Sequence, residues 1–174
     1  MTHILGFSAS MYELFPLGNP LKQLSNGNFL SSKRINEEIT NHYNCSSPEG
    51  MLLEDQDGTL IASHWEYKAI GNEFMIASNR KNSFMSRFTL ALFESTGWYP
   101  FVNYKYAEST TWGKNKGCSF FDTDDCTGSE FCQDSSFGCD WDGTAIGRCG
   151  ISSFSGTCRI FKYFTNTICV DENY

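Results

Sequence analysis

Eight cysteines in 174 residues constrain the fold of this chain more than any other feature of its sequence. Seven of them lie in the last third, at intervals of six to eleven residues, and the full set is Cys45, Cys118, Cys126, Cys132, Cys139, Cys149, Cys158 and Cys169. An even number at such intervals is typical of a disulfide scaffold formed in an oxidising compartment. No pair has the Cys-x-x-Cys spacing of zinc ribbons, ferredoxin-like clusters or thioredoxin-type redox sites. The sequence therefore favours disulfides over metal ligation by cysteine, and it leaves their pairing open.

The balance of charge argues against nucleic acid as a partner. The chain has 13 Lys and Arg against 20 Asp and Glu, a formal net charge of −7, and its pI is about 4.9. Nucleic-acid-binding domains normally present a basic face. At this length we expect one domain, or one domain with a small second one, and a chain that can bury a real core.

Three features of the sequence bear on the cellular compartment of the protein. The triplet Asn44-Cys45-Ser46 is an acceptor sequence for N-glycosylation and, like the cysteines, points to secretion. No apolar run approaches the roughly 18 residues of a transmembrane segment, and the first residues lack the basic start of a signal peptide. The last five residues, 170–174, contain no hydrophobic anchor signal. We expect a secreted or cell-surface protein of which this chain is the C-terminal portion, because the chain itself shows neither signal peptide nor anchor.

Composition predicts an α+β fold made largely of helix and loop. Residues 1–62 are rich in Ser, Asn and Leu and are expected to be mostly loop, with one short helix at Lys33–Tyr43, where Ile35 and Ile39 are spaced for one helical face. From Cys118 onward Gly, Ser, Thr, Asp and Cys dominate, which is typical of short strands and turns. Only two valines occur in the chain, so an extensive sheet is not expected.

The strongest helix signal lies at Phe84–Thr96. Large apolar residues recur there every four positions and predict one buried face. Asn82 or Ser83 can cap the start of this helix, and Gly97 is expected to end it.

Candidates for catalysis reduce to the three histidines, His3, His42 and His64. The chain has no Gly-x-Ser-x-Gly motif, no glycine-rich phosphate loop and no cysteine outside the expected disulfides. His42 falls at the end of the first predicted helix, where a solvated or helix-C-terminal histidine is expected. His64 precedes Trp65, a context more typical of a core or rim residue than of a ligand. His3 differs, because residues 1–6 match the second half of a His-Glu-x-x-His motif followed by x-x-Gly, in which two imidazoles on one helical face bind zinc and the Glu activates a water.

Five short motifs in order make the chain similar to the leishmanolysin-type zinc metallopeptidases, a metzincin family. Sixty residues separate His3 from His64, which fits the insertion that this family carries before its third zinc ligand. The other matches are Ala62-Ser63-His64-Trp65 for the third-ligand motif without its Gly, Phe74-Met75-Ile76-Ala77 for the methionine turn, Phe88–Tyr99 for the next helix and its Trp-Tyr end, and Trp112–Cys118 for the start of a cysteine-rich tail. The resemblance implies that residues 1–113 are the C-terminal portion of a metzincin catalytic region and that residues 114–174 are a disulfide-rich domain.

The resemblance also implies roles for individual residues. His3 and His64 would bind one catalytic Zn²⁺ through neutral imidazole nitrogens, and Met75 would form the hydrophobic floor under the metal, a structural role. If His3 is the second His of its motif, the first His and the catalytic Glu fall immediately before Met1, so the chain holds no catalytic residue of its own. We expect the free polypeptide to bind zinc weakly and to hydrolyse nothing. The parent protein is expected to be a zinc metalloendopeptidase that cleaves peptide or protein substrates.

Two other interpretations stay open. The chain could be a non-catalytic secreted or cell-surface adhesion module on a metzincin scaffold, with the disulfide-rich tail as its binding part. An unrelated cysteine-rich, lectin-like protein would require all five motifs to match by chance. Under the peptidase interpretation three tryptophans are expected to pack in the core: Trp65, Trp98 and Trp112.

Overall fold

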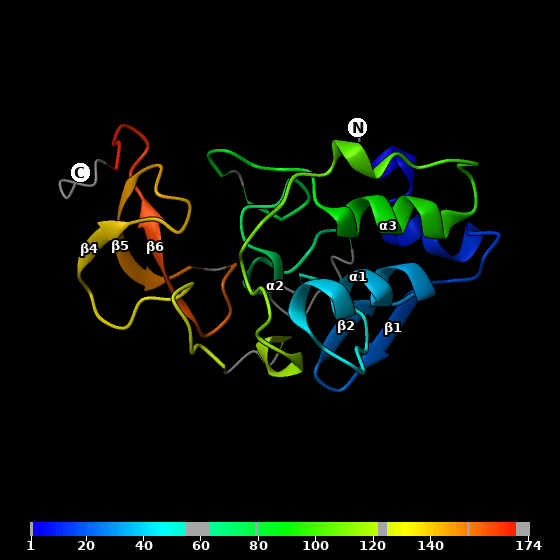
Figure 1. Cartoon of the computed structure of the whole chain (residues 1–174), viewed down its shortest axis with the longest axis horizontal. Coiled ribbons are helices and arrows are strands. Elements are labelled where there is room, and N and C mark those ends of the chain that lie inside the picture. Colours follow the sequence, from blue (N-terminus) through cyan, green and yellow to red (C-terminus); the bar gives the residue numbers. More distant parts are fainter. Residues whose placement is uncertain (1, 55–62, 79, 122–124, 153, 170–174) are drawn as a thin grey trace. The chain divides into compact units, whose positions relative to one another are not determined.

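The computed structural model describes residues 2–54, 63–78, 80–121, 125–152 and 154–169. The chain forms two compact units, Met1–Phe121 and Asp122–Tyr174. Short helices and short strands give a mixed α and β structure, as composition predicts (Figure 1). Four disulfides cross-link the chain. Three positions or segments used in the sequence analysis lie outside the described residues: Met1, Ala62 and 170–174.

Two helices form the centre of the first unit. Its described elements, with η for a 3₁₀ helix, are η1 (Thr2–Leu5), η2 (Ala9–Leu14), β1 (Leu21–Leu24), β2 (Gly27–Leu30), α1 (Lys33–Tyr43), β3 (Met51–Leu52), α2 (Tyr67–Ile70), α3 (Arg87–Thr96), η4 (Tyr104–Tyr106) and η5 (Cys118–Phe121). The helices α1 and α3 lie side by side (Figure 1). Tyr43 of α1 packs on Phe88 of α3 with ring centroids 5.6 Å apart, and both side chains are buried.

The strands β1, β2 and β3 form a small antiparallel sheet in that order. In the chain, β1 and β2 precede α1 and β3 follows it. In its hairpin Leu24 pairs with Gly27 across the two residues Ser25 and Asn26. Gly27, the first residue after the loop, adopts a φ of 140°, a conformation that glycine tolerates best. The prediction that residues 1–62 are mostly loop is wrong for this hairpin, and the Asn26-Gly27 pair is the signal that would have predicted it.

The helix α1 has the bounds that its apolar spacing predicts, Lys33–Tyr43. Ser32 caps its start, because the Ser32 hydroxyl oxygen accepts a hydrogen bond from the N–H of Ile35 at 3.1 Å. Asn44 ends it in the left-handed conformation, with φ 59° and ψ 37°, and its N–H donates to the carbonyl of Thr40.

The helix α3 begins at Arg87, three residues later than the predicted start at Phe84, and ends before Gly97 as predicted. Its cap is Ser86, whose hydroxyl oxygen accepts from the N–H of Thr89 at 3.2 Å. Neither of the predicted caps starts the helix: Asn82 and Ser83. The late start follows from pairing elsewhere in the chain, because the Phe84 backbone is held in an isolated β-bridge.

That bridge uses the carbonyl group of Phe84, which a helix beginning at this residue would need for its first hydrogen bond. The N–H of Phe84 donates to the carbonyl of Asn72 at 3.2 Å, and the carbonyl of Phe84 accepts from the N–H of Phe74 at 2.8 Å. Phe84 therefore pairs with the segment that carries the methionine motif. The apolar period predicts the start of the helix about one turn too early.

Two of the three tryptophans expected in the core are buried there. Trp65 is 0% exposed and Trp112 is 1% exposed. The prediction is wrong for Trp98, which is 37% exposed. Trp98 follows Gly97, where the chain leaves α3, and its ring packs edge to face with that of Phe15, with centroids 5.0 Å apart.

The second unit is a three-stranded antiparallel sheet with the order β4–β5–β6. Its strands are β4 (Phe137–Cys139), β5 (Ile146–Ile151) and β6 (Arg159–Tyr163). The described part of the unit buries few large apolar side chains, so disulfides supply much of its cohesion. They are Cys126–Cys158, Cys132–Cys149 and Cys139–Cys169, while Cys45–Cys118 lies in the first unit. All eight cysteines are paired, which confirms the prediction of a disulfide scaffold.

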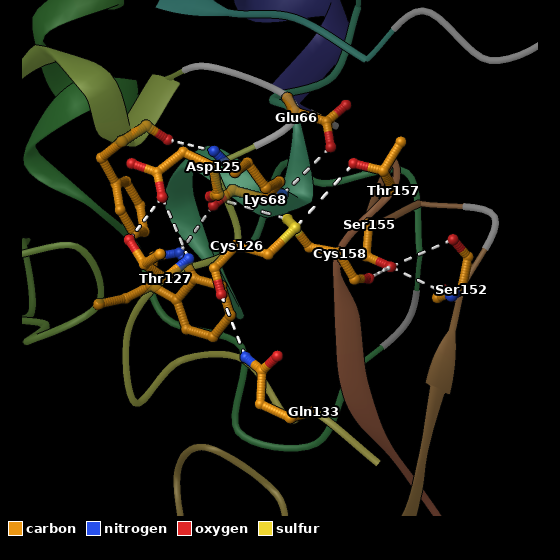
Figure 2. Close-up of a disulfide and its surroundings, with 12 residues drawn as sticks. Glu66, Lys68, Asp125, Cys126, Thr127, Gln133, Ser152, Ser155, Thr157 and Cys158 are labelled. Carbon is orange, nitrogen blue, oxygen red and sulfur yellow. Dashed lines mark hydrogen bonds between the residues drawn. A yellow bond between two sulfur atoms is a disulfide. The ribbon is translucent and has the colours of Figure 1, made fainter. Parts of the chain in front are cut away.

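Local polar turns surround the Cys126–Cys158 disulfide (Figure 2). The carboxylate of Asp125 accepts from the N–H of Thr127 at 3.1 Å and from its hydroxyl. The hydroxyl oxygen of Ser155 accepts from the N–H of Ser152 at 3.1 Å and lies 2.8 Å from the carbonyl oxygen of Cys158. These bonds give hydrogen-bond partners to backbone groups in turns, which lie outside the helices and strands.

Candidate metal site

The fold brings His3 and His64 together across sixty intervening residues. Their ring centroids are 4.9 Å apart and the rings are nearly perpendicular, at 84°. Two imidazoles that share a tetrahedral zinc ion, with Zn–N distances of about 2.0–2.1 Å, have centroids about 5 Å apart. The pair therefore has the spacing of two ligands of one metal ion.

A hydrogen bond orients the His3 ring. Its Nδ1 lies 2.8 Å from the carbonyl oxygen of Phe7, to which it donates when the proton is on Nδ1. Metal-binding histidines usually donate their second ring N–H to an oxygen in this way, which fixes the tautomer and leaves Nε2 for the metal. Gly6, with a φ of 134°, lets the chain turn directly after η1 and so places Phe7 within reach.

His64 is held by backbone bonds on both sides. Its carbonyl accepts from the N–H of Glu54 at 3.0 Å, and the N–H of the next residue, Trp65, donates to the carbonyl of Met75 at 2.9 Å. Burial, followed by the nearby His3, lowers the pKa of His64. Its Nδ1 is buried and has no hydrogen-bond partner among the described residues. A buried ring nitrogen without a partner is costly, and a metal ion is one group that satisfies it.

Trp65 anchors the segment that carries His64. Its side chain is completely buried, and its ring lies 4.5 Å from the ring of Phe7, centroid to centroid. Its Nε1–H donates to the hydroxyl oxygen of Thr89 in α3 at 2.8 Å. Phe7 also accepts the hydrogen bond from His3. This one residue therefore contacts both the ring of His3 and the ring of Trp65, which anchors His64.

Glu73 is a buried acid that the sequence did not single out. It is 0% exposed, and its carboxylate accepts hydrogen bonds from the N–H of Met75, from the N–H of Ser86 at 3.2 Å, and from the hydroxyls of Ser86 at 2.9 Å and Thr89 at 2.6 Å. Burial raises the pKa of Glu73, and these hydrogen bonds oppose the rise. Met75, itself 4% exposed, is therefore held at its N–H by Glu73 and at its carbonyl by Trp65. A glutamate next to an apolar motif usually lies at the surface, so no local pattern predicted this network.

His42 belongs to a different set of contacts. It lies in the last turn of α1, which agrees with the predicted helix-C-terminal position, but its ring is half-buried rather than solvated, and its Nε2 lies 2.8 Å from the carbonyl oxygen of Trp112. The ring also packs against Tyr43 and Phe88, with centroids 4.6 and 5.7 Å away. Burial lowers the pKa of His42. This histidine joins α1 to the segment that carries Trp112.

The described part of the chain holds two imidazoles at this site and no larger cluster. Across residues 2–54, 63–78, 80–121, 125–152 and 154–169, no group of three or more His, Cys, Asp or Glu side chains is placed to hold a metal ion. Catalytic zinc sites use three protein ligands and keep one position open for water. His3 and His64 fit a part of such a site.

Comparison with known proteins identifies the family. The family profile described as leishmanolysin, peptidase M8, matches residues 1–173. The leishmanolysin-like peptidase of Drosophila melanogaster is 44% identical over 88 residues, which cover 50% of this chain and 13% of that protein. The ciliated left-right organizer metallopeptidase of Mus musculus is 30% identical over 183 residues, covering 93% and 26%. Leishmanolysin of Leishmania major is 27% identical over 180 residues, covering 95% and 29%.

The profile match over nearly the whole chain shows the family. The chain belongs to the leishmanolysin family. This confirms the resemblance inferred from the five motifs. The chain spans less than a third of the length of the relatives named above. Within the described residues no helix is both long enough and apolar enough to cross a membrane.

Proposed function

We propose that the protein carrying this chain is a zinc-dependent metalloendopeptidase with a metzincin catalytic region, in which His3 and His64 are two of the three zinc ligands. The observation that carries the proposal is the 4.9 Å between the two imidazole rings in a chain of a metallopeptidase family. Zinc in such a site polarises the scissile carbonyl of a substrate and lowers the pKa of a water molecule to about 7.

The chain's own residues orient the ligands. Phe7 holds the His3 ring through its carbonyl oxygen, and buried Trp65 fixes the position of His64. Met75 would form an apolar floor at the site, since its backbone pairs with Trp65. The His-Glu pair that opens such a motif would supply the remaining imidazole and the general base in the whole protein.

The two parts of the chain are proposed to differ in role. Residues 1–113 would form the C-terminal portion of the catalytic region, and residues 114–174 a disulfide-rich domain that stabilises it. Four disulfides favour a secreted or cell-surface protein, because such bonds persist in oxidising compartments. Peptides or proteins are the proposed substrates, and the net charge of −7 argues against nucleic acid.

A non-catalytic adhesion module on the same scaffold is the second candidate. It would share the His3–His64 pair but lack the third ligand and the general base that a catalytic zinc site needs. In that case a surface of the disulfide-rich part would bind the partner, and the protein would bind no zinc tightly.

Zinc content and affinity decide between the two candidates. We would measure both on the full-length protein carrying this chain and on His64→Ala and His42→Ala, with circular dichroism as a check of folding. His42 is the matched control, because it is a half-buried histidine held by Trp112 rather than a neighbour of His3. We expect one tightly bound zinc that His64→Ala loses and His42→Ala keeps, with cleavage of a denatured protein following the zinc content. Zinc binding that survives in His64→Ala overturns the ligand assignment, and a folded protein with neither zinc nor cleavage supports the adhesion module.

A further inference from the structure

We propose that Asn44 carries an N-linked oligosaccharide, a modification that does not depend on peptidase activity. Asn44-Cys45-Ser46 is the only Asn-x-Ser or Asn-x-Thr triplet in the 174 residues. In the structure Asn44 and Ser46 are exposed, whereas Cys45 is 1% exposed. The two residues that define the acceptor therefore face solvent, and the residue between them points into the core.

The end of α1 gives a structural reason for an Asn at position 44, but it gives none for a Ser at position 46. Asn44 ends α1 in the left-handed region at φ 59°, which Asn and Gly tolerate best, and only its backbone N–H is bonded, to the carbonyl of Thr40. Neither the carboxamide of Asn44 nor the hydroxyl of Ser46 has a hydrogen-bond partner among the described residues. A sugar on Nδ2 of Asn44 would therefore break no observed contact.

Several polar side chains line the surface beside this site. An open hollow of about 430 Å³ adjoins Ser46, and α1 contributes most of its lining, including Asn36, Glu37, Thr40 and Asn41. Amide, carboxylate and hydroxyl groups can hydrogen-bond the hydroxyls and acetamido group of a first N-acetylglucosamine. The hollow therefore offers hydrogen-bond partners to a first sugar.

The transfer itself balances with one lipid-linked donor. Nδ2 of Asn44 forms a bond to the anomeric carbon of the first sugar, the bond from that carbon to the donor's diphosphate breaks, and one amide proton passes to a base of the transferase. The lipid diphosphate leaves. No oxidant or reductant is needed.

The order of synthesis leaves the acceptor accessible. Cys45 is bonded to Cys118, 73 residues later in the chain. Chains grow at about 5–20 residues per second, so Asn44 is synthesised roughly 4–15 s before Cys118. During that interval the disulfide that buries Cys45 cannot form, and the triplet is free to extend into a transferase. Disulfide formation and the transfer of such a glycan both belong to the secretory pathway.

Mass spectrometry of the protein secreted from a eukaryotic cell tests the proposal. Enzymatic removal of N-glycans in water labelled with heavy oxygen converts a glycosylated Asn to a labelled Asp. Cleavage after Arg34 and Lys68 gives one peptide with three asparagines, so Asn36 and Asn41 are internal controls for spontaneous deamidation. We expect the label at Asn44 alone.

Two variants make the test specific. Ser46→Ala keeps Asn44, Cys45 and every observed contact, so the protein is expected to fold and be secreted while losing all label at Asn44. Ser46→Thr restores an acceptor and is expected to keep the label. An unlabelled Asn44 in the secreted wild-type protein, or a label that persists in Ser46→Ala, overturns the proposal.

Discussion

Trp65 and Glu73 share one hydroxyl, that of Thr89, which accepts from the indole N–H at 2.8 Å and donates to the carboxylate at 2.6 Å. Glu73 also accepts from the N–H of Met75. These hydrogen bonds join three segments of the chain: the residues after His64, the methionine motif and the helix α3. The candidate ligand His64 is thus positioned by a helix that does not contain it.

Removal of the Glu73 carboxylate is expected to destabilise the first unit strongly. Glu73→Ala leaves the donors of Met75, Ser86 and Thr89 buried without an acceptor and opens a cavity, at a cost of about 3–5 kcal/mol. Glu73→Gln keeps one oxygen but turns an amide group toward a donor, and is expected to cost about 1–2 kcal/mol. Urea unfolding measures both, with the exposed Glu13→Ala as the control that changes little. A cost of Glu73→Ala no larger than that of Glu13→Ala would contradict the network.

The pH dependence of unfolding is expected to report the titration of Glu73. Burial raises its pKa above the ordinary value of 4.5, so the protonated form is favoured more in the folded than in the unfolded chain. The resulting contribution to stability is complete below about pH 4.5 and is lost as pH rises through the raised pKa. The free energy of unfolding of the wild type should therefore fall relative to that of Glu73→Gln between about pH 4.5 and the raised pKa. Parallel urea titrations of the two proteins check this, and a difference that does not change with pH would count against it.

Glu38 of α1 and Arg87 of α3 form an ion pair across the helix interface. Arg87 donates through two nitrogens to the nearly buried carboxylate, at 2.7 and 2.9 Å, and Arg34 pairs with the same group at 3.0 Å. Arg87→Met is expected to cost about 1–2 kcal/mol, because Arg34 still pairs with Glu38 and the Arg87 side chain is 48% exposed and partly screened. The cost should shrink in high salt.

The matched control for that pair is Lys22→Met, which removes the same charge from an exposed position in β1. It is expected to change the free energy of unfolding by less than about 0.5 kcal/mol. If the two variants lose equal stability at low salt, the Glu38–Arg87 pair does not join the helices.

Gly113 and Gly117 allow a test of packing with backbone strain held constant. Both have positive φ, 66° and 80°, so an alanine at either costs about 1 kcal/mol. A Cβ at Gly113 would lie 2.5 Å from Phe120 and 2.7 Å from Tyr43, while one at Gly117 meets nothing described within 4 Å. Gly113→Ala is therefore expected to cost about 2–4 kcal/mol by thermal or urea unfolding. Equal costs would show that the rings of Phe120 and Tyr43 yield freely.

Local patterns in the sequence predicted the features that depend on neighbours in the chain. The apolar period gave both bounds of α1, and Gly97 ended α3, because a helix face and a left-handed cap involve residues within a few positions. Composition predicted the disulfide-rich unit of short strands. The same local reasoning extended α3 by one turn, since it could not see the bridge between Phe84 and Glu73.

The sequence by itself determined the family, through the order of five short motifs, and the paired state of the cysteines, through their number and spacing. Only the tertiary structure decided which cysteines pair, that Glu73 is buried among four donors, that His42 is held by Trp112, and that the rings of His3 and His64 lie 4.9 Å apart. These are contacts between residues far apart in the chain. Their geometry depends on how helices and strands pack, and packing is a property of the whole core rather than of any local stretch.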